Sequence, residues 1–173
     1  MKKFSTRNVA LTGMLFALAI VLSFIEGLLS PMLGLPPGVK LGLSNIVVMF
    51  ALFYLGKPQA FFLVILKSGF AMLTRGVIAG ILSLSGGLLS CLVLVLLSLI
   101  PFKITLLVFS VTGAIMHNIG QLIALRFVVT GSAYTIYYLP VLLVSGLVMG
   151  SITSVSLNAV MPALKKLGIY QEK

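Results

Sequence analysis

Residues 77–100 read VIAGILSLSGGLLSCLVLVLLSLI, a run of twenty-four residues without one charged side chain. A helix needs about 20 mostly apolar residues to cross the hydrocarbon core of a bilayer, so this run is long enough to span one. The rest of the 173-residue chain has a similar character: 60% of its residues are hydrophobic, 8% are charged, and the mean hydropathy is +1.25. A soluble domain carries about 25% charged residues. The sequence therefore predicts an all-α integral membrane protein.

Apolar segments separated by short breaks fill the remaining sequence and predict six transmembrane helices in a single domain, residues 1–173. Gly56-Lys57-Pro58, Arg75-Gly76 and Pro101-Phe102-Lys103 are typical of helix ends and turns. The basic N-terminus followed by an apolar run is similar to a signal peptide. That run is long, however, and no clear small-residue cleavage site follows it, so we expect a retained first helix. The helices are predicted at about residues 8–29, 41–56, 59–75, 77–100, 104–129 and 136–164.

Most basic residues lie at segment ends that would share one side of the membrane. Cytoplasmic loops carry an excess of Lys and Arg. A cytoplasmic N-terminus places eight of the twelve basic residues inside, so we predict that both termini are cytoplasmic. The net charge of +10 is scattered and forms no basic stripe with interleaved aromatic residues, so no nucleic-acid partner is predicted. The eight are Lys2, Lys3, Arg7, Lys57, Lys103, Lys165, Lys166 and Lys173.

The few charged residues inside or beside the apolar segments indicate a candidate site. A charge at the bilayer centre costs at least about 2.5–3.5 kcal/mol on insertion scales, so it usually faces a cavity or a partner. Lys67 and Arg75 lie about 80° apart around one predicted helix, so both can border one cavity. Glu26 is either a counter-ion for a cation such as Lys40 or Lys67, or a residue that contacts the ligand or anchors a loop. In the predicted orientation, the half of the bundle that faces outside carries one acidic residue, Glu26, and four basic residues, which favours an anionic ligand. The four are Lys40, Lys67, Arg75 and Arg126.

Two later segments combine small and polar residues. The stretch Ser83-Leu-Ser-Gly-Gly-Leu-Leu-Ser90 allows close helix packing, or the approach of a ligand to exposed backbone. His117, Asn118 and Gln121 cluster within one turn, which favours a polar cavity over an isolated core histidine. A metal site is not predicted, because the chain has one His, one Cys and no nearby carboxylate cluster.

A third group of small residues lies in the first predicted helix. Ala10, Gly13 and Ala17 recur at a spacing of three or four residues. Small residues spaced in this way let another helix approach closely. The approaching helix belongs either to this chain or to a second protein.

Several of these motifs together resemble the Gx transporter family, often labelled heptaprenyl diphosphate synthase component I. That family is grouped with the substrate-binding S components of energy-coupling factor (ECF) transporters. The resemblance covers nearly the whole chain. Lys67 departs from the arginine that the family pattern favours; it keeps the charge but loses bidentate anion binding. The matching residues are Glu26, Pro31, the block Pro37-Gly-Val-Lys-Leu-Gly-Leu-Ser-Asn45, Ser83 to Ser90, and His117-Asn-Ile-Gly-Gln121.

The resemblance implies a six-helix bundle with a ligand pocket open to the outside. The loop after the first helix, including Pro37 to Asn45, would cap that pocket. The small-residue face of Ala10, Gly13 and Ala17 would dock on a membrane coupling subunit, which two cytoplasmic ATPases drive. Such a protein is expected to be a multi-pass protein of a bacterial plasma membrane.

The sequence lacks the residues of a prenyl synthase or an ATPase. Prenyl chain elongation needs aspartate-rich clusters that hold Mg²⁺, but the chain has no aspartate, and its two glutamates lie at opposite ends. No Gly-x-x-x-x-Gly-Lys-[Ser/Thr] motif occurs. We therefore expect neither enzymatic activity nor a cofactor.

The leading hypothesis is a membrane substrate-binding subunit for uptake of a small anionic or polar organic molecule, energised by partner proteins. The alternative is a non-catalytic membrane subunit of a prenyl diphosphate- or quinone-linked enzyme complex. A self-sufficient proton-coupled carrier is less favoured, because no clear inverted repeat is present. The predicted pocket residues are Glu26, Lys40, Asn45, Lys67, Ser83, Ser85, His117, Asn118 and Gln121.

Overall fold

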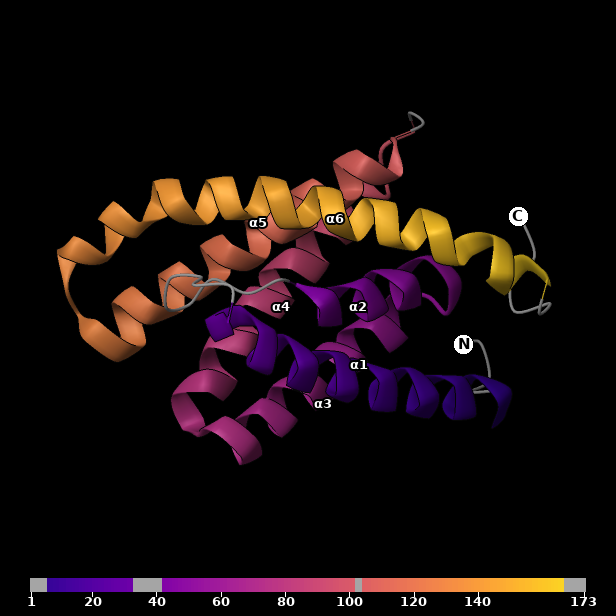
Figure 1. The fold of residues 1–173 in the computed structure, drawn as a ribbon, viewed down its shortest axis with the longest axis horizontal. Helices are drawn as coiled ribbons and strands as arrows, with labels where there is room; N and C mark the ends of the chain where they lie inside the picture. The colour runs from indigo at the N-terminus through magenta and orange to yellow at the C-terminus, as the bar shows by residue number, and fades with distance from the viewer. Residues whose placement is uncertain (1–5, 33–41, 102–103, 167–173) are drawn as a thin grey trace.

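The computed structural model describes residues 6–32, 42–101 and 104–166, and every regular element in these ranges is a helix (Figure 1). The predicted all-α class is confirmed. Six α-helices, one π-helical segment and one 3₁₀ segment occur in the described ranges. In chain order they are α1 (Thr6–Met32), α2 (Leu43–Tyr54), α3 (Lys57–Arg75), α4 (Val77–Leu97), α5 (Leu106–Ala124), η1 (Leu125–Thr130, π), η2 (Ala133–Tyr138, 3₁₀) and α6 (Leu139–Lys166).

Four of the described helical segments are long and apolar enough to cross a membrane. Their outward side chains are largely hydrophobic; Phe24, Phe127 and Val155, for example, are all more than half exposed. Because so much apolar surface would be unfavourable in water, the chain is a membrane-embedded helical protein. The four segments are Val9–Leu29, Val77–Leu97, Leu106–Thr130 and Tyr134–Ala159.

Helix α2 forms the centre of the hydrophobic core. Its residues Val47 to Leu52 are buried without interruption, as expected for a helix that is apolar on every side. Its 12 residues extend about 18 Å, which is shorter than the roughly 30 Å hydrocarbon thickness. Ser44, in the first turn of α2, is buried against Glu26, so the N-terminus of α2 lies inside the bundle, next to the polar residues described below.

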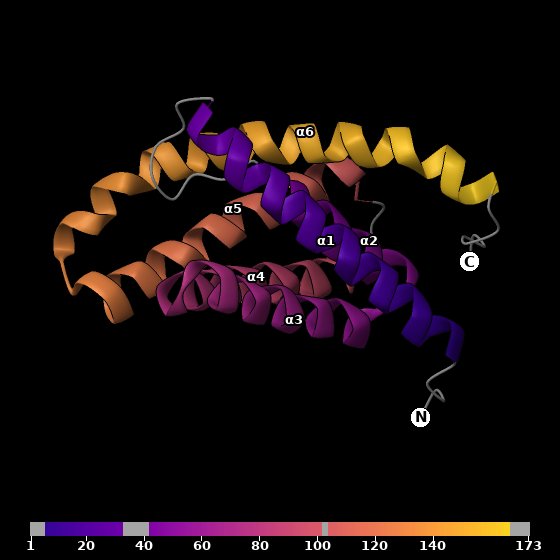
Figure 2. The same ribbon diagram turned by 60° about the horizontal axis from the view of Figure 1, so that its bottom comes forward.

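The other helices pack around α2 in chain order, with α4 between α3 and α5, and with α6 on α5 (Figures 1 and 2). Glycines bring α4 and α5 into backbone contact. A Cβ atom added at Gly120 would lie 2.7 Å from the Ser85 carbonyl oxygen, and one at Gly86 would lie 2.7 Å from the His117 carbonyl oxygen. The sequence allowed two roles for the small residues of the 83–90 stretch, close helix packing or the approach of a ligand. At Gly86 the structure shows close helix packing.

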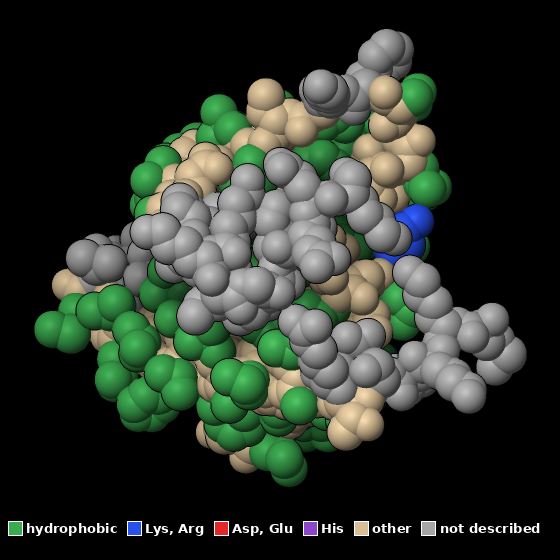
Figure 3. All heavy atoms as spheres, turned by 90° about the vertical axis from the view of Figure 1, so that its right-hand side faces the viewer, with side chains coloured by type: hydrophobic (Ala, Val, Ile, Leu, Met, Phe, Trp, Pro, Cys, Tyr) green, Lys and Arg blue, Asp and Glu red, His purple; other side chains and the backbone are tan. Residues whose placement is uncertain are grey.

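The ends of the bundle differ in the elements that they carry. The start of α1, the end of α6 and the α2–α3 turn at Lys57 lie at one end, whereas the α3–α4 turn lies at the other (Figure 1). Viewed from the first end, the molecule shows a largely apolar periphery with a basic side chain at its edge (Figure 3). Because α1 begins and α6 ends at the same end of the bundle, the chain crosses between the two ends an even number of times from Thr6 to Lys166.

The connection between α5 and α6 contains two helical segments with irregular hydrogen bonding. The helix continues past Ala124 as a π-helical turn, in which the Gly131 N–H donates to the Arg126 carbonyl over 2.8 Å. Gly131 has φ +63°, a left-handed conformation that suits glycine. The 3₁₀ segment Ala133–Tyr138 then leads into α6. Hydropathy shows only that this region is apolar, so it does not reveal the change in hydrogen-bond spacing.

Candidate functional site

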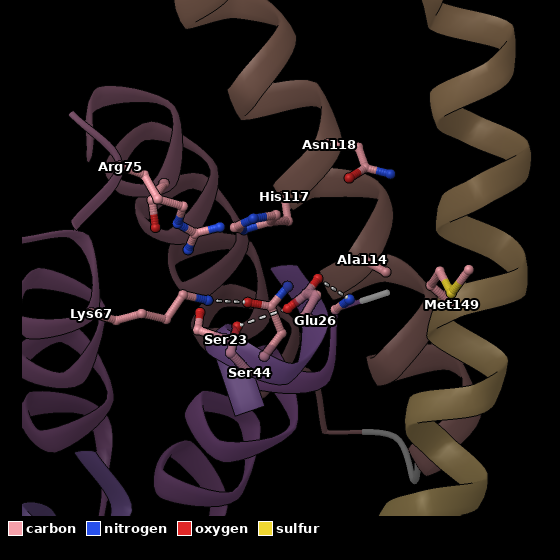
Figure 4. A pocket seen from close by; sticks show the side chains of 12 residues that line it. Ser23, Glu26, Ser44, Lys67, Arg75, Ala114, His117, Asn118 and Met149 are labelled. Carbon is pink, nitrogen blue, oxygen red and sulfur yellow. Dashed lines mark hydrogen bonds between the residues drawn. The ribbon is translucent and has the colours of Figure 1, made fainter. Parts of the chain in front are cut away.

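Polar side chains from α1 to α5 converge on one cavity near the N-terminus of α2 (Figure 4). Helices α1 to α5 each provide at least one polar side chain, and α6 provides the side chain of Met149. The described residues that line it are Ser23, Glu26, Gly42, Ser44, Asn45, Lys67, Arg75, Ser83, Ala114, His117, Asn118 and Met149. Six of the nine predicted pocket residues are among them: Glu26, Asn45, Lys67, Ser83, His117 and Asn118.

The cavity is nearly closed in this conformation. About 20 Å³ is open to the centre of a water molecule, which is room for roughly one water. A second chamber of about 30 Å³ lies next to it, on the side of Ser90, Ser110 and Thr153. His117 and Met149 line both chambers. An organic ligand therefore fits within these chambers only if their walls move apart.

Glu26 connects α1 to the start of α2. The carboxylate is 3% exposed; one oxygen accepts the Gly42 N–H at 2.6 Å, and the other accepts the Ser44 hydroxyl at a longer 3.5 Å. Gly42 has φ +74°, which a residue with a side chain rarely adopts. A helix N-terminus carries partial positive charge and unsatisfied N–H groups, so it stabilises this buried carboxylate. Anchoring the chain at the start of α2 is one of the roles that the sequence suggested for Glu26.

Lys67 lies on the opposite wall of the cavity. Its side chain is 7% exposed, and Nζ donates to the Asn45 side-chain oxygen over 2.7 Å (Figure 4). The next residue is Ser68, whose hydroxyl donates to the Val64 carbonyl and lies 3.3 Å from the Ser83 hydroxyl. Lys67 thus extends from α3 toward α2 inside the bundle, and its ammonium group does not snorkel to the membrane surface.

Arg75 contributes a second cation at the edge of the cavity. It is the last residue of α3, it is exposed, and its guanidinium points toward His117 (Figure 4). Within the described ranges no hydrogen bond or ion pair involves Arg75. Gly76 follows with φ +92° and ψ 167°, and α4 begins at the next residue. The Arg75-Gly76 break predicted from the sequence is therefore a one-residue turn that holds Arg75 beside the cavity.

The polar residues of α5 have different environments. The Nε2 atoms of His117 and Gln121 lie 3.1 Å apart, and both side chains are buried. The Asn118 amide donates to the Leu142 carbonyl at 2.8 Å and to the Ser145 hydroxyl at 3.1 Å, so it also joins α5 to α6. His117 lines the cavity, whereas Gln121 does not line it but contacts His117.

The remaining predicted residues lie elsewhere. Ser85 donates to the Leu82 carbonyl on its own helix and does not line the cavity, while Lys40 lies outside the described residues. Arg126 is in η1, with its guanidinium 5.6 Å from the Phe127 ring centre. The predicted docking residues Ala10, Gly13 and Ala17 are all on the exposed side of α1.

Sequence reasoning missed Ser23, Ala114 and Met149 among the residues that line the cavity, whereas Gly42 and Ser44 belong to the Pro37–Asn45 block that the resemblance implied as its cap. Ser23 is a single serine in an apolar helix, and hydrogen bonding to neighbouring backbone is the usual expectation for it. Ala114 and Met149 carry no charge or hydrogen-bonding side chain. A helical register shared with Glu26 could have indicated Ser23, which lies three residues before it.

These features define a helical membrane protein with a narrow, cation-bearing polar cavity at the N-terminus of a short central helix. The chain belongs to the family described as Heptaprenyl diphosphate synthase component I, whose profile matches residues 15–160. The resemblance inferred from the sequence motifs is thereby confirmed. A comparison with curated proteins gives no match, and neither does a comparison with solved structures.

Proposed function

We propose that this chain is the substrate-binding subunit of an uptake system in a bacterial plasma membrane, and that it binds a small anionic or polar organic molecule. The observation that carries the proposal is the convergence of Lys67, Asn45 and His117, from three different helices, on one cavity in an otherwise apolar bundle. Polar groups are costly to hold in hydrocarbon, so a cavity of this kind is a candidate binding site in a membrane protein.

The charges at the cavity favour an anionic group on the ligand. Lys67 and Arg75 both line it, and Glu26 is the one acidic residue among those that do. The Glu26 carboxylate accepts hydrogen bonds at the start of α2, which provides its stabilisation separately from the two cations. An anion between Lys67 and Arg75 would gain charge-assisted hydrogen bonds in a site of low polarity.

The topology that goes with this function has six membrane crossings and cytoplasmic termini. In it, α2 and α3 serve as two shorter crossings beside the four long ones. The end that carries Lys57, the start of α1 and the end of α6 is the cytoplasmic end, because it collects most of the basic residues.

Energy for uptake is supplied by partners in this proposal. The sequence contains no P-loop and no aspartate, so we assign it neither ATP hydrolysis nor another catalytic role. The exposed face of Ala10, Gly13 and Ala17 docks on a membrane coupling subunit that cytoplasmic ATPases drive. An S component of an ECF transporter has this division of labour.

The test is ligand retention by the purified protein in lipid nanodiscs, followed by native mass spectrometry. Lys67→Leu and His117→Leu should each lose the bound molecule, while Lys57→Leu, a change at the exposed start of α3, should retain it. Circular dichroism checks that all three variants remain folded. Unchanged ligand retention in both cavity variants would refute the proposal.

The family description favours a second candidate, a non-catalytic membrane subunit of a prenyl diphosphate- or quinone-linked enzyme complex. This candidate predicts that a prenyltransferase co-purifies with the chain and that no small molecule occupies the cavity. The same native mass spectrometry distinguishes the two candidates, because it reports bound protein and bound small molecules separately.

A further inference from the structure

A groove of about 460 Å³ separates the C-terminal halves of α1 and α3, which diverge toward Arg75 (Figure 2). Phe24, Gly27, Leu28 and Phe70 form much of its wall. Phe24 is 67% exposed and Leu28 is 56% exposed, so the groove opens sideways to the membrane. Its described lining extends over about a turn and a half of each helix, apolar at Phe24, Leu28 and Phe70 and polar toward Thr74 and Arg75.

The groove leads to the central cavity. Ser23 and Arg75 line both, so the apolar wall gives way to a cation at the inner end. Within the described ranges the Arg75 guanidinium has no hydrogen-bond or ion-pair partner, and it points toward His117 (Figure 4). An arginine carries five N–H donors in a fork that matches a carboxylate or phosphate, so an anionic group at this point would satisfy it.

A second groove between the same two helices provides an internal comparison. It has about 360 Å³ and lies near their N-terminal halves, where Val9, Gly13 and Phe62 help to line it. None of the described residues that line it is charged, and none of them lines the central cavity. Crossing helices can leave such gaps, but of these two grooves it is the one at Arg75 that joins an apolar channel to a cation and a polar cavity.

We propose that the ligand of the central cavity is a single-chain amphiphile from the bilayer, with its anionic head between Arg75 and Lys67 and its apolar chain in the groove between α1 and α3. This inference rests on the proposed substrate-binding function and narrows its ligand class. The volumes favour it, because the cavity has room for about one water whereas the neighbouring groove is large. Most of the ligand therefore lies outside the cavity, and only its head enters.

Photolabelling tests the proposal. The probe is dodecyl phosphate with a photoreactive group in its chain, added to the protein in phosphatidylcholine nanodiscs. Peptide mapping should place the label on residues 23–28 and 70–75, and unlabelled dodecyl phosphate should compete for it. Arg75→Gln should lower labelling by about tenfold, the effect of losing one charge-assisted hydrogen bond.

Two glycines of α1 provide a matched pair of variants. Neither Gly13 nor Gly27 has an atom within 4 Å of an added Cβ, so leucine is accommodated at both positions. Gly27→Leu fills the groove at Arg75 and should abolish labelling there, whereas Gly13→Leu fills the other groove and should leave it unchanged. Equal labelling of the wild type and Gly27→Leu would overturn the inference.

Two further outcomes separate this inference from the function on which it rests. In the first, inorganic phosphate or acetate binds to the protein, its binding depends on Lys67, and Gly27→Leu does not affect it. That result would support the substrate-binding function but would refute the proposal that the ligand is an amphiphile. Groove labelling that is independent of both Arg75 and Lys67 would identify an ordinary lipid site and overturn the inference as well.

Discussion

Replacing Gly120 by alanine tests the backbone contact between α4 and α5 on which the site depends. The added Cβ would lie 2.7 Å from the Ser85 carbonyl oxygen, 2.8 Å from the Gly86 Cα and 3.1 Å from the Gly86 nitrogen. All three are backbone atoms, so no side chain can rotate away. The helices must separate by about 0.7 Å to restore ordinary contact, a gap that forfeits a quarter to a half of the dispersion attraction between facing atoms.

The expected cost of Gly120→Ala is about 1–3 kcal/mol of overpacking. Alanine also favours a helix over glycine by about 1 kcal/mol, which partly offsets that cost. Gly69→Ala in α3 is the matched control, because a Cβ there meets nothing within 4 Å. Both variants gain the same helix propensity, so the difference between them isolates the packing cost and should be about 1–3 kcal/mol.

The assay is equilibrium unfolding in mixed micelles with increasing dodecyl sulfate, followed by circular dichroism. A ligand measurement on the same variant adds a second readout, since His117 and Gln121 lie on the face of α5 that would move. We expect Gly120→Ala to weaken ligand retention and Gly69→Ala to leave it unchanged. Equal stability of the two variants would refute the backbone contact between α4 and α5.

Two other positions give predictions of the same kind. Gly76→Ala should destabilise the chain by about 1–3 kcal/mol through backbone strain alone, because φ +92° with ψ 167° suits only glycine and nothing lies near an added Cβ; unfolding at the wild-type midpoint would contradict it. Glu26→Leu should cost about 1–3 kcal/mol more than Glu26→Gln, since leucine leaves the Gly42 N–H without its acceptor while glutamine can still accept it. Unfolding measurements on both Glu26 variants check this, and equal losses would show that the α1–α2 hydrogen bond contributes nothing.

The polar cluster of α5 was predictable because helical periodicity is local. His117 and Gln121 were expected to lie within one turn from their spacing alone, and both are buried in the structure. The 80° separation of Lys67 and Arg75 likewise placed both at one cavity. Each of these inferences needs only one helix and its regular geometry.

Interactions between helices were not predictable in the same way. The contact of Glu26 with the start of α2 and that of Asn118 with α6 each join segments that are many residues apart. Their formation depends on how far each helix is displaced along its neighbour, and an offset of one residue rotates a side chain by about 100°. No pattern within one segment contains that information.

Composition and hydropathy by themselves determined that this chain is a helical membrane protein, because in hydrocarbon the backbone must satisfy its own hydrogen bonds and a helix does so locally. The motifs also identified the family. Only the tertiary structure decided which scarce polar groups meet, that the cavity they form is nearly closed, and that a membrane-facing groove leads to it at Arg75. Those features arise from helix crossing and register, which depend on packing across the whole bundle.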